Sequence, residues 1–393
     1  MSHDDIPFAR PFIGTEEEDA VIRVLRSGWL TTGVEAMNFE QEFAAFLKSP
    51  PILSTGDIHC LAVNSATSGL HLALEACGVG PGDTVLVPSC TFTATAEVAR
   101  YLGADPVFVD VSPGSFHIDP AALEQTIKRL PPEKAKAVIP VHYGGLSCDM
   151  EAIMGIARRY GLKVIEDAAH AFPSALAGTV GDAGVFSFYA TKTITTGEGG
   201  MIVCHDETMS RRISVMRSHG IDRAVWNRYS DARASWYYEV VEAGYKYNLP
   251  DVLAAIGRVQ LARAWDLLRM REEIAAAYDS AFSGSEYLLL PPTGPGDARH
   301  LYPLRLNPQR LRISRDEFIQ KLKEAGIGVS VHFIPLHTMP FYKNRYHLTE
   351  EDFPETIQSC RQEISLPIWP GMSAAQVNRV IEAVLSISGN FAA

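Results

Sequence analysis

The sequence predicts an α/β protein with a large domain, built on a mainly parallel mixed sheet flanked by helices, and a smaller C-terminal α/β domain. Short apolar runs alternate with helical segments from about residue 60 to 205, which is the pattern of parallel strands joined by crossover helices. The chain of 393 residues also exceeds one ordinary domain. We expect an N-terminal arm over residues 1–15, the large domain over 16–265 and the small domain over 266–393.

The period of the apolar residues defines the elements of the large domain. Two amphipathic helices come first, at Thr15–Leu25, where acidic residues occupy the first turn, and at Ala36–Leu47. The expected strands are Leu61–Val63, Thr84–Val87, Pro106–Val111, Ala137–Val141, Lys163–Ile165, Val185–Phe188 and Met201–Cys204, and the helices between them are Ser68–Cys77, Ala94–Tyr101, Ala121–Leu130 and Ile153–Tyr160. The interval from Phe188 to Met201 is too short for a helix, so the last two strands are expected to be antiparallel.

The strand pattern fades after about residue 205. A long helix is expected over Leu249–Ala277, with Pro250 in its first turn, and it leads into the small domain. That domain is expected to contain two strands and two helices, at Tyr302–Leu306, Val329–Phe333, Arg315–Ala325 and Ser373–Ile387.

The composition argues against several classes of protein. A net charge of −11 does not suit a nucleic-acid backbone binder, which needs a basic face. No uncharged apolar run reaches about 18 residues, so no membrane span is expected. With no visible signal peptide, the expectation is a soluble cytoplasmic protein. The six cysteines form no Cys-x-x-Cys pair and no His-x-x-x-His spacing occurs, so buried free thiols and no metal site are expected.

Lys192 is the most informative residue of the chain. It lies between the last two expected strands, after an apolar run and before a glycine-rich turn. A desolvated amine loses proton affinity and becomes a nucleophile toward carbonyls. Asp167 ends an earlier strand. A lysine that forms a Schiff base and an aspartate that holds a pyridinium nitrogen are the pair that a pyridoxal phosphate enzyme needs.

Several other residues have two interpretations when each is taken alone. Ala66 and Thr67 open a helix whose first N–H groups suit a phosphate, or they belong to an ordinary Ser/Thr cap. Phe92 either stacks on an aromatic cofactor or packs in the core. Asp167 and His170 follow a buried strand, where the carboxylate needs a partner: a pyridinium N–H, or a structural cap or ion pair.

Two later segments are equally ambiguous. Lys246 and Asn248 precede the long helix and either contact an anion or form a solvated turn. His332 and His337 follow a small-domain strand and either face a cleft or are structural. The order of all these features along one chain favours the functional interpretation.

The chain resembles the DegT/DnrJ/EryC1/StrS family of pyridoxal-phosphate-dependent nucleotide-sugar aminotransferases, which have the fold-type-I architecture. The most specific match is Phe186-Ser-Phe-Tyr-Ala-Thr-Lys192 with its trailing Gly197-Glu-Gly-Gly200. Further matches run nearly end to end and comprise Ser27-Gly-Trp-Leu-Thr-Thr-Gly33, Ser65-Ala-Thr-Ser68, Glu166-Asp-Ala-Ala-His-Ala171, Gly244-Tyr-Lys-Tyr-Asn-Leu249, Val331-His-Phe-Ile-Pro-Leu-His337 and Ser365-Leu-Pro-Ile-Trp-Pro-Gly371.

The resemblance implies a role for each candidate in the large domain. Lys192 would be the Schiff-base lysine and the proton carrier, and Asp167 the partner of the pyridine nitrogen. His170 would lie near the ring hydroxyl, and Phe92 would stack on the ring. The phosphate would be held by Ala66, Thr67 and Ser187.

The resemblance also implies a homodimer with each site at the subunit interface. Lys246 and Asn248 would reach the cofactor from the other subunit. The implied substrate contacts are Trp29, Thr31, His332 and His337.

The implied reaction transfers an amino group from an amino acid, glutamate in most relatives, to a nucleotide-linked keto sugar. His170, where relatives often carry Gln, together with Gly244-Tyr-Lys-Tyr-Asn-Leu249, resembles the enzymes that aminate C4 of a 4-keto-6-deoxy sugar. The alternatives are a C3 aminotransferase or a dehydratase on the same scaffold, or a non-catalytic cofactor-binding regulator. Lys192 argues against the dehydratases, which carry a histidine there. The aromatic segment Trp226–Tyr238 either lines the sugar pocket or packs at the dimer interface.

Overall fold

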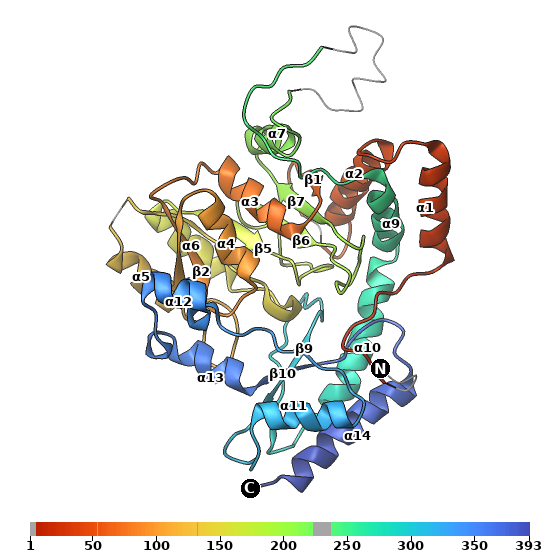
Figure 1. Ribbon diagram of the computed structural model, residues 1–393, viewed down its shortest axis with the longest axis vertical. Coiled ribbons are helices and arrows are strands. Elements are labelled where there is room, and N and C mark those ends of the chain that lie inside the picture. The colour runs from red at the N-terminus through yellow and green to blue at the C-terminus, as the bar shows by residue number, and fades with distance from the viewer. Residues whose placement is uncertain (1–4, 53, 132, 223–236) are drawn as a thin grey trace.

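Two separate sheets organise the protein (Figure 1). The computed structural model describes residues 5–52, 54–131, 133–222 and 237–393. The larger sheet has the strand order β1-β7-β6-β5-β4-β2-β3. Its strands are β1 (His59–Val63), β2 (Thr84–Pro88), β3 (Asp105–Val109), β4 (Ala135–Val138), β5 (Lys163–Asp167), β6 (Ala183–Ser187) and β7 (Gly200–Cys204). The smaller, antiparallel sheet has the order β10-β9-β8 and comprises β8 (Leu288–Leu289), β9 (Tyr302–Leu306) and β10 (Glu363–Leu366).

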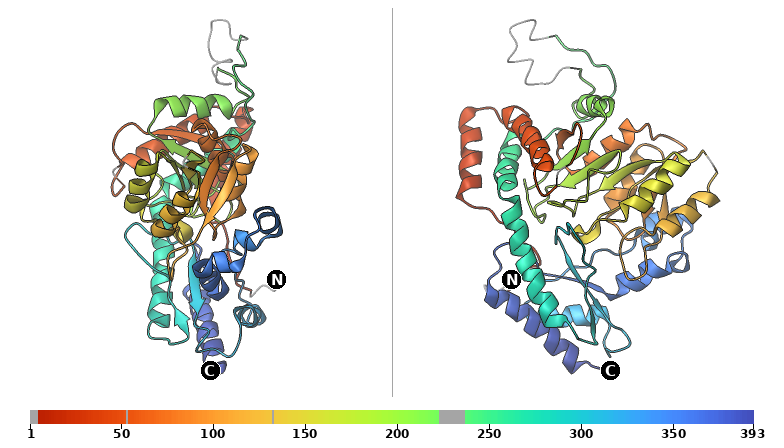
Figure 2. Two further views of the ribbon diagram at one scale, coloured as in Figure 1. Left: turned by 90° about the vertical axis from the view of Figure 1, so that its left-hand side faces the viewer. Right: turned by 180° about the vertical axis from the view of Figure 1, so that it is seen from behind.

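Helices cover both sheets and connect them. Around the larger sheet lie α2 (Val34–Lys48), α3 (Ala66–Ala76), α4 (Thr93–Tyr101), α5 (Pro120–Arg129), α6 (Met150–Tyr160) and α7 (Glu207–Met216), whereas α1 (Thr15–Ser27) packs against α9 (Asp251–Ala262). Helices α9 and α10 (Ala264–Phe282) run from the larger sheet to the smaller one (Figure 2). The C-terminal part contains α11 (Arg315–Glu324), α12 (Pro340–Tyr346), α13 (Pro354–Gln362) and α14 (Ala374–Asn390). None of the helices described has the length and apolar character that crossing a bilayer requires.

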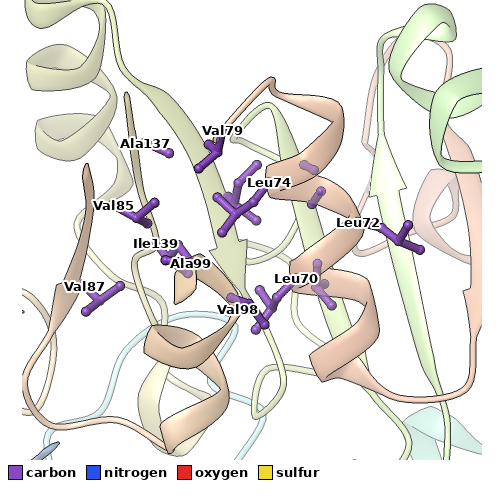
Figure 3. Packing of buried hydrophobic residues seen from close by; sticks show 14 of the residues in the cluster. Leu70, Leu72, Leu74, Val79, Val85, Val87, Val98, Ala99, Ala137 and Ile139 are labelled. Atoms are coloured by element: carbon purple, nitrogen blue, oxygen red, sulfur yellow. The ribbon is translucent and has the colours of Figure 1, made fainter. Parts of the chain in front are cut away.

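The core between the larger sheet and α3 fixes where that helix begins. Leu70, Leu72 and Leu74 of α3 are buried with apolar side chains of the neighbouring strands (Figure 3). A Cβ at Gly69 would lie 2.7 Å from Cγ1 of Val185, so the helix approaches β6 more closely than any other residue would permit. This packing holds the start of α3 near the end of β6.

The predicted fold class is confirmed. Strand β2 pairs in parallel with β3 and β4, β4 with β5, and β5 with β6. Strand β7 lies antiparallel between β1 and β6, as the short interval before Met201 predicted.

The predicted strand Val329–Phe333 is wrong, and the small sheet is completed by β8 and β10 instead. Only one isolated bridge, Ser330 to Ser365, is recorded in this stretch of the described chain. Its polar backbone groups are taken up by side chains: the N–H of His332 donates to Oε2 of Glu363, and the hydroxyl of Tyr143 donates to the carbonyl of His332. A backbone group that bonds a side chain is not available to pair with a neighbouring strand, so this segment cannot add a strand to the sheet.

The predicted helix Leu249–Ala277 is two helices. The backbone leaves helical geometry at Arg263, with φ −105° and ψ 5°, and the N–H of Arg263 bonds the carbonyl of Gln260, three residues back. Pro250 precedes the first turn of α9 as its N-cap instead of lying within it. The break lies close to the domain boundary expected at residue 265, which stays a prediction.

Candidate active site

A cavity of about 460 Å³ collects most of the residues singled out from the sequence. Its lining comes from the start of α3, the ends of β5 and β6, the loop before β7, and segments adjoining the small sheet. The predicted site residues that line it are Ala66, Thr67, Phe92, Asp167, His170, Ser187, Lys192 and His332.

A larger, open groove of about 1140 Å³ lies beside α7, but none of the predicted site residues lines it. Its arginine and lysine side chains are both already paired, Arg212 with Glu75 and Lys163 with Asp182. The chemistry is therefore concentrated in the smaller cavity.

Lys192 is held after β6 by a tight turn in which its N–H donates to the carbonyl of Tyr189 over 2.9 Å. The residue is half-buried, and its Nζ lies 3.5 Å from Nε2 of His300. Burial lowers the pKa of the Lys192 amine to about 7; the charge of Asp167 opposes this shift and that of Arg271 adds to it. At neutral pH a large fraction of this amine is therefore unprotonated.

Asp167 ends β5 with its carboxylate buried at the cavity. One oxygen accepts from the hydroxyl of Thr95 over 2.7 Å, and the other accepts from the N–H of Ala169 over 3.1 Å. Burial raises the pKa of Asp167 even though both hydrogen bonds lower it. A cationic or N–H partner within the cavity would compensate for this desolvation.

The neighbouring Glu166 faces the other side of the sheet and fixes the strand end that carries Asp167. It accepts from Nε2 of His142 over 2.8 Å and from the N–H groups of Gly178, Val180 and Gly181 over 2.6–2.8 Å. Burial alone would raise the pKa of Glu166, but these hydrogen bonds lower it. Since Nδ1 of His142 accepts from the N–H of Cys148, the ring proton lies on Nε2 and points at the carboxylate.

Three histidines surround the amine. The ring centroid of His170 lies 4.6 Å from that of His300 and 6.3 Å from that of His332. Burial and the charge of Lys192 lower the pKa of all three rings, that of His332 to about 4. The rings are therefore uncharged at neutral pH. Nδ1 of His170 accepts from the N–H of Gly144 over 3.2 Å, which leaves its ring proton on Nε2.

The first turn of α3 supplies backbone donors. Ser65 caps the helix by accepting from the N–H of Ser68 over 3.1 Å, while no described residue accepts from the N–H groups of Ala66 and Thr67. A Cβ at Gly200 would lie 2.8 Å from the nitrogen of Ala66, so glycine there allows the turn to approach the end of β6. Free N–H groups at a helix start are suited to binding a phosphate.

Phe92 presents an aromatic surface to the cavity. Its side chain is 58% exposed, although most phenylalanines of the described chain are buried, and its ring centroid lies 6.0 Å from that of Phe333. The core interpretation of Phe92 is therefore excluded.

Five candidates do not line the cavity of their own chain, and four of them lie together. Asn248 donates from Nδ2 to the hydroxyl of Thr32 over 2.6 Å, and Lys246 is exposed nearby. Trp29 and Thr31 belong to the same loop as Thr32. These residues form one surface patch, at the junction of the α1–α2 loop with the segment before α9.

His337 is not a substrate contact in this structure. Its ring is fully buried, lies 4.4 Å from the ring of Phe353, and bonds the hydroxyl of Ser89 through Nδ1. The ring packs behind the end of β2, so it serves the core and not the cavity. Of the aromatic segment, Trp226, Tyr229 and Trp236 lie outside the described residues, and Tyr237 and Tyr238 are exposed.

The sequence interpretation missed several residues that complete the site. Thr95 holds Asp167, and His300 lies beside Lys192. Arg271 is buried and donates to the carbonyls of His300 and Ile368 over 3.1 and 2.7 Å. A charged residue on the apolar face of the expected helix was an available signal for Arg271, whereas nothing local distinguished His300.

These groups fit pyridoxal phosphate. The cavity offers free helix N–H groups and a hydroxyl for a phosphate, a buried carboxylate for a pyridinium N–H, a half-exposed aromatic ring and an amine of lowered pKa. Together with the mainly parallel sheet, they define a pyridoxal phosphate enzyme of the α/β class.

The chain belongs to the DegT/DnrJ/EryC1/StrS aminotransferase family, whose model matches residues 11–385. It is 45% identical over 390 residues to the spore coat polysaccharide biosynthesis protein SpsC of Bacillus subtilis, with 97% of each chain covered. It resembles the putative sugar aminotransferase Spr1654 of Streptococcus pneumoniae in its PMP form, with a TM-score of 0.88, 31% identity, and 98% and 100% of the two chains covered. For PseC, an aminotransferase of Helicobacter pylori involved in pseudoaminic acid biosynthesis, the TM-score is 0.87 at 28% identity, with 99% and 100% covered. The family depends on pyridoxal phosphate, and Spr1654 is also known in a PLP form.

Proposed function

We propose that this aminotransferase moves an amino group from an amino acid, glutamate in the first instance, to C4 of a nucleotide-linked 4-keto-6-deoxy sugar. The observation that carries the proposal is the convergence of Lys192, Asp167 and the start of α3 on one cavity. The sugar is supported by the named relatives, which include a putative sugar aminotransferase, an aminotransferase of pseudoaminic acid biosynthesis and a polysaccharide biosynthesis protein. The C4 position is supported by His170 together with the segment Gly244-Tyr-Lys-Tyr-Asn-Leu249, which resemble the enzymes that aminate a 4-keto sugar.

Each residue at the cavity has a proposed task. Asp167 would hold the pyridine N–H of the cofactor, and His170 would donate from Nε2 to the ring oxygen. The phosphate would be bound by Ala66, Thr67 and Ser187, and Phe92 would cover one face of the ring. When bound, pyridoxal phosphate supplies an electrophilic carbonyl carbon and an electron-poor ring that stabilises charge on the adjacent carbon.

Lys192 would both anchor the cofactor and move the proton. With its pKa near 7, the free amine accepts a proton from the donor amino acid and returns it to an adjacent atom as the general acid. The rings of His170, His300 and His332 are uncharged, so they place no further positive charge near Nζ. A histidine at this position, as in the dehydratase alternative, would lack an amine to anchor the cofactor.

We also propose a homodimer with shared sites. Lys246 and Asn248 do not line the cavity of their own chain, which supports a role in the cavity of a second copy. Trp29 and Thr31 adjoin them and would reach the same substrate.

The test is a panel of nucleotide-linked keto sugars incubated with the purified enzyme, pyridoxal phosphate and glutamate. We expect an amino sugar, with NMR of the product showing nitrogen at C4. Lys192→Ala should abolish both turnover and the visible absorbance of the lysine-bound cofactor, whereas Lys128→Ala on the surface should change neither. Undiminished transamination by Lys192→Ala would sink the proposal, and amination at C3 would overturn the C4 assignment.

A further inference from the structure

A buried hydrogen-bonded chain leads away from the cavity behind His332. Nδ1 of His332 lies 2.8 Å from the hydroxyl of Ser365, and that hydroxyl lies 2.5 Å from Oε1 of Glu363. The second carboxylate oxygen, Oε2, accepts from the backbone N–H of His332 over 2.9 Å. One carboxylate therefore holds both the backbone and the ring of the same histidine.

Glu363 and Ser365 are built into the core of the small sheet. Both lie on β10, two residues apart and therefore on one face, and both are fully buried. An ionised carboxylate at such a place is costly unless its oxygens are bonded. Within the described chain, the bonds to those oxygens come from His332 and Ser365. Among the described residues, the hydrogen-bond partners of this carboxylate are thus His332 itself and the serine that contacts its ring.

We propose that Glu363 and Ser365 are positioning residues which, with Glu363 ionised, fix the ring and tautomer of His332 so that Nε2 faces the cavity as an acceptor for a substrate hydroxyl. The hydroxyl of Ser365 has one hydrogen, which goes to Glu363, so Ser365 must accept the proton of Nδ1. Nε2 then carries a lone pair. The ring lines the cavity, and no described residue bonds Nε2. The substrate part of this inference rests on the proposed function.

The tautomer of His332 depends on the protonation state of Glu363. When Glu363 is ionised, the hydroxyl of Ser365 donates to its Oε1. Burial raises the pKa of Glu363 to about 8, against the opposing bonds from Ser365 and His332 and the charge of Arg315, so the ionised carboxylate and the acceptor form of Nε2 predominate above that pH. The other ionisable groups recorded as interacting with Glu363 in the described chain are Tyr143 and Cys360. Below that pH a protonated Glu363 donates to Ser365, and the proton of His332 moves to Nε2.

NMR of the full-length protein labelled with ¹⁵N-histidine tests the relay without turnover. The signals of His332 are assigned by their loss in His332→Gln. We expect the proton on Nδ1 at pH 9 and on Nε2 at pH 6.5. Ser365→Ala should remove the Nδ1 preference at pH 9, and Glu363→Gln should abolish the reversal with pH. Ser330→Ala, whose recorded bonds are made by its backbone, is the matched control. A proton on Nε2 at pH 9 in the unaltered protein, or the same tautomer in Ser365→Ala, overturns the relay.

Kinetics test the substrate contact separately. At pH 9, where Glu363 is ionised, loss of one oriented hydrogen bond should raise the KM of the keto sugar about tenfold in Ser365→Ala. The absorbance of the lysine-bound cofactor and kcat should stay close to those of the unaltered enzyme. An unchanged KM alongside an altered tautomer would overturn the substrate contact. If the unaltered enzyme aminates no keto sugar, the proposed function fails, and the NMR result still decides the relay.

Discussion

Nζ of Lys192 lies 3.5 Å from Nε2 of His300, a residue 108 positions further along the chain. Arg271 fixes the backbone of His300 by donating to its carbonyl over 3.1 Å. The burial of the amine therefore depends on two residues of the C-terminal part, and not on the loop of Lys192 alone.

Replacing His300 with Ala should raise the pKa of Lys192. Water would enter the space left by the ring and relieve part of the desolvation that lowers the pKa to about 7, so we expect a rise of roughly one unit. The pKa of Lys192 can be followed by the rate at which the cofactor-free protein acquires the visible absorbance of bound pyridoxal phosphate, because only the unprotonated amine reacts. The acid limb of this rate should move to higher pH in His300→Ala, and less so in His300→Gln, which keeps a polar side chain. Coincident pH profiles would show that His300 does not shield the amine.

Replacing Lys192 with Met should stabilise the cofactor-free protein most at pH 7 and below. The folded pKa of about 7 lies below the unfolded value of about 10.4, so between these values the unfolded chain binds the extra proton and destabilises the fold. Stability of the unaltered protein should therefore rise with pH across this window. Urea unfolding at pH 7 and pH 9.5 should show the advantage of Lys192→Met shrinking as the pH rises. An advantage that is independent of pH would point to packing instead.

Asp167 should matter through its charge more than its shape. Asp167→Asn keeps an acceptor for Thr95 but removes the negative charge beside the pyridine nitrogen, so kcat should fall about 100-fold or more. Thr95→Val leaves the carboxylate in place and should cost about tenfold or less. Steady-state rates with saturating pyridoxal phosphate measure both. Equal losses in the two variants would argue that Asp167 acts only as a structural cap.

Glu166 should contribute to stability and not to the chemistry. In Glu166→Gln the side-chain amide presents an N–H group where the carboxylate had accepted from Gly178 and His142. This loss of acceptors should lower the free energy of unfolding by about 3 kcal/mol. Because the pKa of Glu166 is lowered, the stabilisation is present above the unfolded value of about 4.3 and is lost as the pH falls through the folded value. Denaturant titrations at pH 7 and pH 3.5 should show the difference shrinking in acid. The surface variant Glu124→Gln should leave stability nearly unchanged at both.

The elements of the larger sheet were predictable because each strand carries its own signal. A strand that is buried on both faces is an apolar run in the sequence, whatever its neighbours are. The interval from Phe188 to Met201 is too short for a crossover helix, so β7 had to be antiparallel to β6. The segment Val329–Phe333 carries the same kind of run but makes no ladder, because Glu363 and Tyr143 take its backbone groups. The local pattern of apolar residues does not show which hydrogen-bond partner a backbone group will have in the folded protein.

The sequence by itself determined the α/β class, the lysine and aspartate that converge on the cavity, and the family to which the chain belongs. These follow from periodicity and from residue types that one chemistry requires. Tertiary structure alone decided that His300 and Arg271 enclose Lys192, that His337 is buried beside Phe353, and that Glu363 reaches His332. The reason is physical: pKa, burial and tautomer depend on neighbours brought together across long separations in sequence, and a single residue type carries no information about them.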